Sequence, residues 1–300
     1  MFLNLEKKYV NLPNGERYAY IEKGEGDKVV LLIHGNNASS IHYEPLYREF
    51  PEGYRVVAPD LRGFGDSSYN KSFDTIHEIA DDVALFMKEL GITSAYVVGW
   101  SFGGCVSQSL AARYPALVEK LVLLCSGSVK GFPVFKKNAM GQSKVGELYE
   151  SKEELALDPI TVVPLLEIER KNDTKNMEII WNYTIYTSKS QKRPDEDASE
   201  IFLLESCKER CLVDADWALM RFNITDTTSF YAPGEDLAKD IKCPILAVNG
   251  EDDIVVPEIM TSENRQALPS LKQVYYADCG HSVMVDQPAQ FLKDLIEFIG

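Results

Sequence analysis

The sequence has no long apolar run and no excess of positive charge. A helix that crosses a bilayer needs about 20 consecutive apolar residues, and no segment of the 300-residue chain approaches that length. Lys and Arg number 31 against 46 Asp and Glu, so the net charge is −15. Phosphate backbones and anionic lipid headgroups repel such a chain, and we therefore expect neither nucleic acid nor a membrane surface as a partner.

Signals for secretion, metal binding and cofactor binding are also missing. Residues 1–16 lack the apolar core of a signal peptide. The six cysteines form no C-x-x-C pair, and Cys207 and Cys211 have no further Cys or His close by in the sequence. A zinc site requires such additional ligands. We therefore expect a cytoplasmic protein with reduced thiols and no metal. A Gly-rich phosphate loop is absent too, so no cofactor is expected.

The sequence does contain alternating strand and helix patterns. Apolar and polar residues alternate around an Asn-Gly pair within residues 9–24, which is typical of a β-hairpin. Apolar residues spaced by three and four, with Thr75 and Glu78 as a capping box, predict an amphipathic helix over 75–91. Continuous apolar runs predict buried strands at residues 28–35, 54–60, 94–100 and 119–126. This alternation indicates an α/β fold, a mostly parallel twisted sheet with helices on both faces.

The strand pattern stops after Ser126 and resumes at residues 243–250. The residues between are charged and aromatic-rich, with helical spacing and no signal for a buried strand. A helical insertion over residues 128–235 is as large as a small domain, but both of its ends continue into one sheet. We therefore expect an α/β core from residues 1–127 and 236–300, and a helical cap, or lid, from residues 128–235.

Ser101 lies in the segment Gly-Trp-Ser-Phe-Gly-Gly, between a predicted strand and a predicted helix. This context is the one that a nucleophile elbow requires, with small residues two before and two after the serine. Gly99 and Gly103 occupy those positions. The following helix directs its positive N-terminal end toward the site where an oxyanion would form. The alternative is an ordinary polar residue in a glycine-rich loop.

A serine nucleophile needs a general base, and the chain has four histidines. His77 falls on the polar face of a predicted helix, so we expect it to be solvated. His42 begins a helix, at the surface or at a pocket rim, and His34 adjoins the glycine that ends a strand. His281 follows the last predicted strand and has the setting of a mobile base.

The acid that orients the base should follow another strand. Glu251, Asp252 and Asp253 come directly after the strand at 243–250. With Ser101 and His281 they complete the order serine, acid, histidine, which is associated with the α/β-hydrolase fold.

At this point the sequence resembles a capped, esterase-like serine hydrolase of the α/β-hydrolase fold superfamily. Five motifs in the family's order carry the resemblance, and they cover the predicted core but leave the cap unmatched. They are HGN at 34–36, DLRGFGDSS at 60–68, GWSFGG at 99–104, NGEDDIVVP at 249–257 and CGHSVMVDQP at 279–288.

The resemblance implies a role for several residues. The family's spacing of a glycine and a proline around the acid favours Asp253, with Asp252 as the fallback. The oxyanion hole would use the backbone N–H groups of Phe102 and Asn36. His34 would then be structural, beneath the loop that carries Asn36.

The segment 60–68 is interpreted as a structural loop, in which Asp60 and Arg62 form an internal pair and the glycines make backbone turns.

Ser101 at the nucleophile position argues against haloalkane dehalogenases and epoxide hydrolases, which are similar but attack through a carboxylate. The hypothesis is therefore a carboxylic-ester hydrolase that forms an acyl-enzyme on Ser101 and acts on small to medium, largely apolar esters. Two alternatives stay open: a lactonase, for example one acting on acyl-homoserine lactones, and a ligand receptor on a hydrolase scaffold. No oligomeric state follows from the sequence.

Aromatic side chains of the cap are candidates for the substrate pocket, although aromatics at helical spacing are more often core. We expect two or three of them to face the substrate, Trp100 to pack away from Ser101, and Phe102 to form a pocket wall. The cap aromatics are Trp181, Tyr183, Tyr186, Phe202, Trp217, Phe222, Phe230 and Tyr231.

Overall fold

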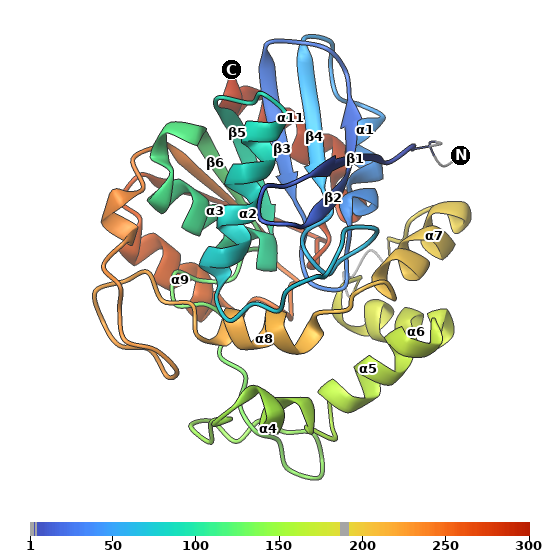
Figure 1. The fold of residues 1–300 in the computed structure, drawn as a ribbon, viewed down its shortest axis with the longest axis vertical. Coiled ribbons are helices and arrows are strands. Elements are labelled where there is room, and N and C mark those ends of the chain that lie inside the picture. Colours follow the sequence, from blue (N-terminus) through green and yellow to red (C-terminus); the bar gives the residue numbers. More distant parts are fainter. Residues whose placement is uncertain (1–2, 4, 187–191) are drawn as a thin grey trace.

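A computed structural model describes residue 3, residues 5–186 and residues 192–300 (Figure 1). Within these residues, eight strands form one sheet in the order β1-β2-β4-β3-β5-β6-β7-β8. The pairs β1–β2 and β2–β4 are antiparallel, and the later pairs are parallel. The strands are β1 (Lys8–Asn11), β2 (Arg17–Lys23), β3 (Lys28–Ile33), β4 (Tyr54–Pro59), β5 (Ala95–Trp100), β6 (Val118–Leu124), β7 (Ile245–Gly250) and β8 (Leu271–Tyr276).

Within the described residues, helices alternate with the strands as the sequence predicts. No helix in these ranges is both long enough and apolar enough to cross a bilayer. The α-helices are α1 (Glu44–Tyr47), α2 (Ile76–Glu89), α3 (Phe102–Arg113), α4 (Lys152–Ala156), α5 (Val162–Lys171), α6 (Thr174–Thr184), α7 (Glu196–Ser206), α8 (Leu212–Met220), α9 (Glu258–Ala267), α10 (Val283–Asp286) and α11 (Pro288–Ile299). The short 3₁₀ helices are η1 (Ser40–Tyr43), η2 (Pro115–Leu117) and η3 (Ala238–Asp240).

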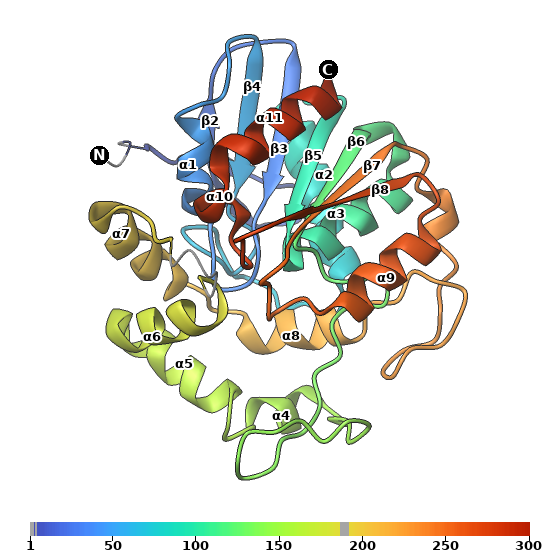
Figure 2. The ribbon, with the colours of Figure 1, turned by 180° about the vertical axis from the view of Figure 1, so that it is seen from behind.

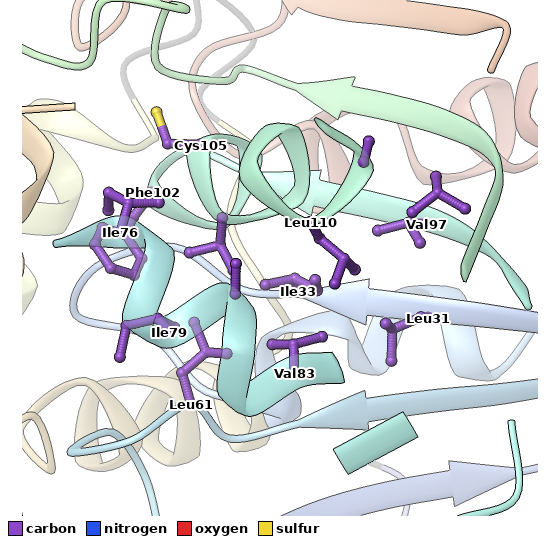
Figure 3. Close-up of a cluster of buried hydrophobic side chains, with 14 of the residues drawn as sticks. Leu31, Ile33, Leu61, Ile76, Ile79, Val83, Val97, Phe102, Cys105 and Leu110 are labelled. Carbon is purple, nitrogen blue, oxygen red and sulfur yellow. The ribbon is translucent and has the colours of Figure 1, made fainter. Parts of the chain in front are cut away.

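Two apolar layers enclose the sheet. Helices α2 and α3 cover one face, and α1 and α11 cover the other, as Figures 1 and 2 show from opposite sides. Figure 3 shows Val83 of α2 beside the strand residues Leu31 and Ile33, and Ile76 of α2 beside Phe102 of α3. Burial of this apolar stripe, rather than helix propensity, supplies most of the stability of such a helix. The predicted α/β class with a mostly parallel sheet is confirmed.

Local signals in the sequence account for the ends of these elements. The Thr75 side chain accepts a hydrogen bond from the Glu78 backbone N–H, and the Glu78 carboxylate accepts one from the Thr75 N–H, so the predicted capping box is present. Gly91, with φ of +67°, follows the helix end. The predicted hairpin is present as β1 and β2.

Between β6 and β7 the described residues form five α-helices, α4 to α8, and no strand beyond isolated bridges. We call residues 128–235 the insertion; its limits as a separate cap stay a prediction. Ala215 and Leu219 of α8 belong to the same buried cluster as Phe102 of α3. Trp181 of α6 and Phe202 of α7 pack in the cluster on the opposite face of the sheet. The insertion therefore shares its apolar core with both faces of the sheet.

The predicted pair between Asp60 and Arg62 is wrong. Arg62 instead binds the buried carboxylate of Asp82 on α2 through two nitrogens, each 2.7 Å from an oxygen. The Asp60 carboxylate accepts hydrogen bonds from the N–H and hydroxyl of Ser40. The two residues are close along the chain, but their side chains bind different elements of the fold.

Lys7 connects the N-terminal segment to the insertion. Its ammonium group lies 2.8 Å from Asp60, 2.9 Å from Asp66 and 2.7 Å from Glu205 of α7. Burial alone would lower the pKa of Lys7, but the carboxylates Asp60 and Glu205 raise it above its ordinary value. The three carboxylate oxygens are close enough to bind a cation, and the ammonium group of Lys7 already fills that role.

Replacing Arg62 with Met should strongly destabilise the fold, because the Asp82 carboxylate would stay buried without its cation. Losing one partner of a buried ion pair costs about 3–5 kcal/mol. Urea denaturation measures the free energy of unfolding, and Arg170→Met, which removes a solvent-exposed partner of Glu167, is the control. Equal stability of the two variants would contradict the assigned pairing.

Candidate active site

Ser101 sits at a sharp turn between β5 and α3, with φ of +55° and ψ of −117°. This conformation is rare for a residue with a side chain and is retained where the surroundings enforce it. A Cβ atom on Gly103 would lie 2.2 Å from the carbonyl oxygen of Ile33, and one on Gly99 would lie 2.4 Å from that of Gly103. Only glycine fits at both positions, so the geometry is that of a nucleophile elbow.

Helix α3 begins directly after Ser101 and has no side-chain cap at its N-terminus. The first N–H groups of a helix have no partner within the helix and carry partial positive charge. The backbone N–H of Phe102 is therefore placed to face negative charge that develops beside Ser101. The Phe102 side chain is buried, with its ring centroid 5.8 Å from that of Phe64. That it forms a pocket wall stays a prediction.

His281 lies between β8 and α10, next to the residue that precedes Ser101. The indole N–H of Trp100 donates to the His281 carbonyl oxygen over 2.9 Å, and the two rings are 5.7 Å apart between centroids. Trp100 is buried, as expected. The Gly280 N–H donates to the Asp286 carboxylate over 2.6 Å. These contacts position the His281 loop at the carboxyl end of the sheet, beside the elbow.

The structure brings Asp253, rather than Asp252, to the histidine. Asp253 Oδ2 is 2.9 Å from His281 Nδ1, and its Oδ1 accepts hydrogen bonds from the N–H groups of Val255 and Val256. Burial by itself raises the pKa of Asp253, but His281 and these N–H donors outweigh it and lower the pKa. A carboxylate that stays ionised fixes the Nδ1–H tautomer of His281 and leaves Nε2 free to accept a proton.

Cys125 follows β6 and joins this pair in the interior. One ligand atom from each of Cys125, Asp253 and His281 lies within 4.8 Å of the others. Burial raises the pKa of the Cys125 thiol well above its ordinary value, so this side chain is a neutral neighbour of the pair. No sequence motif predicted this contact, although Cys125 lies at the end of the strand predicted over 119–126.

The segment with His34, Gly35 and Asn36 passes next to Ser101. A Cβ atom on Gly35 would lie 3.0 Å from the Cβ atom of Ser101. Asn36 is half-buried, and its side-chain N–H donates to Asp216 of α8 over 3.1 Å. The structure therefore brings Asn36 and Phe102 to the surroundings of Ser101. Their roles as oxyanion donors stay predictions.

The other three histidines have structural partners. The N–H of Leu61 donates to His34 Nε2 over 3.0 Å, and burial lowers the pKa of His34 to about 4, which agrees with its expected place beneath the loop. His42 is buried beside aromatic rings rather than at the surface, and burial lowers its pKa to about 3. His77 is half-buried and contacts Ser109 and Glu235, so it is less solvated than expected.

The cap aromatics are mostly packed in the interior. Trp181, Tyr186, Phe202 and Phe222 are buried, whereas Tyr183 and Phe230 are largely exposed. Trp217 and Tyr231 are half-buried and pack against a smaller buried cluster. The interpretation as core therefore holds fully for four of the eight cap aromatics.

Three carboxyl groups of the insertion that the sequence analysis missed face the segment with Asn36. Glu169 lies on α5, Asp216 on α8, and Glu209 between α7 and α8. Burial raises the pKa of Glu169 to about 8 and that of Asp216 to about 7. Burial and the nearby Glu169 charge raise the pKa of Glu209 well above its ordinary value. No sequence motif marks these residues, because each lies on a different element.

Comparison with known proteins agrees with this geometry. A family profile described as alpha/beta hydrolase fold matches residues 28–156. Lipase 1 of Psychrobacter immobilis is 26% identical over 295 residues, which cover 94% of this chain and 80% of the lipase. Bifunctional epoxide hydrolase 2 of Sus scrofa is 23% identical over 98% of this chain and 55% of its own length. An esterase from Exiguobacterium antarcticum superposes with a TM-score of 0.72 at 18% identity, covering 98% of this chain and 99% of the esterase.

The chain therefore has the α/β-hydrolase fold that the resemblance implied. The similarity to lipases and esterases supports a hydrolase of this fold.

Glu169→Gln should change how stability depends on pH. The pKa of Glu169 is about 8 in the folded protein and ordinarily 4.5, so between these values the folded state binds the proton more tightly than the unfolded chain. The free energy of unfolding therefore falls as pH rises through this window. Because glutamine does not ionise, the variant should gain stability relative to the parent as pH rises from about 5 to about 8.

Denaturant midpoints at both pH values measure this difference. Glu178→Gln on the exposed face of α6 is the control and should show no such gain. A stability difference between Glu169→Gln and the parent that is the same at both pH values would contradict the raised pKa.

Proposed function

We propose that this protein is a serine hydrolase of carboxylic esters, with Ser101 as nucleophile, His281 as general base and Asp253 as the orienting acid. The observation that carries the proposal is the buried pair of His281 and Asp253 next to a serine in strained elbow geometry. A serine, a base within the same site and an acid behind the base are the parts that acyl transfer requires.

In the proposed reaction, Ser101 Oγ attacks the ester carbonyl carbon while His281 Nε2 accepts the hydroxyl proton. The Asp253 carboxylate stabilises the imidazolium that forms. The backbone N–H groups of Phe102 and Asn36 bind the negative oxygen of the tetrahedral intermediate. His281 then gives its proton to the departing alcohol, which leaves an acyl group on Ser101. A water molecule, activated by His281, releases the acid and restores the serine.

The identity of the nucleophile separates this proposal from epoxide hydrolysis. One relative is named as an epoxide hydrolase. Epoxide hydrolases that resemble this chain attack through a carboxylate. Here the elbow residue is Ser101. An acyl group on a serine is released by water through the usual steps of ester hydrolysis.

Small to medium esters are the proposed substrate class. Lactones are cyclic esters and would follow the same steps, so a lactonase is a special case of this proposal rather than a different mechanism. A receptor on a hydrolase scaffold would instead bind such a molecule without turnover.

Ser101→Ala should reduce the hydrolysis of short-chain p-nitrophenyl esters by at least about a thousandfold, because the acyl-enzyme has no other oxygen on which to form. The substrates tested should also include lactones and linear esters of equal chain length. Ser143→Ala, at an exposed serine of the insertion, is the matched control and should retain the parent rate.

Retained turnover by Ser101→Ala would overturn the proposal. Binding of an ester that stabilises the parent protein without any turnover would favour the receptor instead.

A further inference from the structure

Side chains of the insertion contact the segment that carries the expected oxyanion donor. We call residues 34–37 the oxyanion loop. The backbone N–H of Asn37 donates to Glu209 Oε2 over 2.6 Å, and its side-chain N–H donates to Glu169 Oε1 over 2.8 Å. The neighbouring Asn36 donates to Asp216. Helices α5 and α8 and the segment between α7 and α8 therefore accept hydrogen bonds from two consecutive residues of the loop.

Asn37 needs such partners because its backbone is strained. Its φ is +48°, in the left-handed region that residues with side chains rarely adopt. Asparagine tolerates this region better than most residues, yet the conformation persists only where contacts enforce it. The hydrogen bonds from Asn37 to Glu209 and Glu169 supply such contacts.

Glu209 is placed firmly against the core. Its side chain is 4% exposed. The next residue, Arg210, donates its backbone N–H to the carbonyl oxygen of Gly63 over 2.8 Å, and the Cys211 thiol lies 3.5 Å from the carbonyl oxygen of Arg62. The residues around Glu209 thus contact the core loop at 60–68, so the carboxyl group has little freedom to follow a moving oxyanion loop.

The position of the oxyanion loop matters because it lies against the nucleophile. Gly35 packs on Ser101 so closely that even a Cβ atom would come within 3.0 Å of the Ser101 Cβ atom. An oxyanion donor must lie about 2.7–3.1 Å from the oxygen that becomes negative. A small rotation at Asn37 would move the adjacent Asn36 N–H out of that range.

We propose that Glu209 and Glu169 are positioning residues that set the oxyanion loop, so that the contact between the insertion and the loop completes the oxyanion hole. This inference rests on the proposed ester hydrolysis. Neither residue needs to touch the substrate: both act through Asn37. The insertion then controls the rate of the chemical step.

Two variants of Glu209 test the role of its acceptor oxygen. Glu209→Ala removes the acceptor for the Asn37 N–H and should lower kcat about ten- to a hundredfold, a part of the loss seen when an oxyanion donor is removed. KM should change by less than about threefold, because the loop donor acts mainly in the transition state. Glu209→Gln keeps an acceptor oxygen and should restore kcat to within about threefold of the parent.

Asn37→Gly provides a test that does not remove a buried carboxyl group. Glycine adopts the positive φ without strain but lacks the side chain that donates to Glu169. The loop should be freer, and kcat should fall about tenfold at nearly constant KM. If Glu209→Ala does not fold, as judged by circular dichroism, this variant decides the question. Glu178→Ala on the exposed face of α6 is the matched control.

Inhibition by an alkylboronic acid, which forms a tetrahedral adduct on a serine, gives a second readout. Its inhibition constant should rise in Glu209→Ala and Asn37→Gly by the same factor as kcat/KM falls. An unchanged kcat and inhibition constant in both variants, a loss confined to KM, or an equal loss in Glu209→Gln and Glu209→Ala would overturn the inference. Activity in Ser101→Ala would instead overturn the proposed function, so the two failures are distinct.

Discussion

The active-site region depends on one backbone constraint, the turn at Ser101. Its positive φ is kept by the close packing of α3 against β3, where Gly103 approaches the carbonyl oxygens of Ile33 and His34. The same packing directs the N-terminus of α3 at the serine and brings Gly35 against it. Strain at Ser101 and the geometry around it therefore have a common origin, the contact between the start of α3 and the carboxyl end of β3.

The insertion contacts this region and the core through apolar packing, ion pairs and hydrogen bonds. Apolar residues of α8 share a buried cluster with α3, while Lys7 connects Glu205 of α7 to Asp60 in the core. Carboxyl groups of the insertion also accept hydrogen bonds from Asn37. Burying a carboxyl group is costly unless it makes hydrogen bonds. Glu169 and Glu209 are buried, have raised pKa values and accept hydrogen bonds from the strained loop beside Ser101.

The sequence was sufficient for features written into consecutive residues. Apolar runs predicted the buried strands, the Thr75 capping box predicted the start of α2, and the glycines predicted the elbow. The sequence did not predict the contacts between elements that are far apart along the chain. Arg62 pairs with Asp82 on α2, and His42 is buried by aromatic rings from the insertion. Likewise, only the packing of separate helices brings Glu209 to the oxyanion loop.

Trapping the acyl-enzyme tests the central claim most directly. The parent protein is quenched with acid during turnover of a p-nitrophenyl ester, and intact and peptide masses are measured. The account predicts a mass increase equal to one acyl group on the peptide that contains Ser101; with a lactone substrate, the increase should equal the whole lactone, since the alcohol stays attached. Turnover with an adduct on another residue, such as Cys125, would contradict the account.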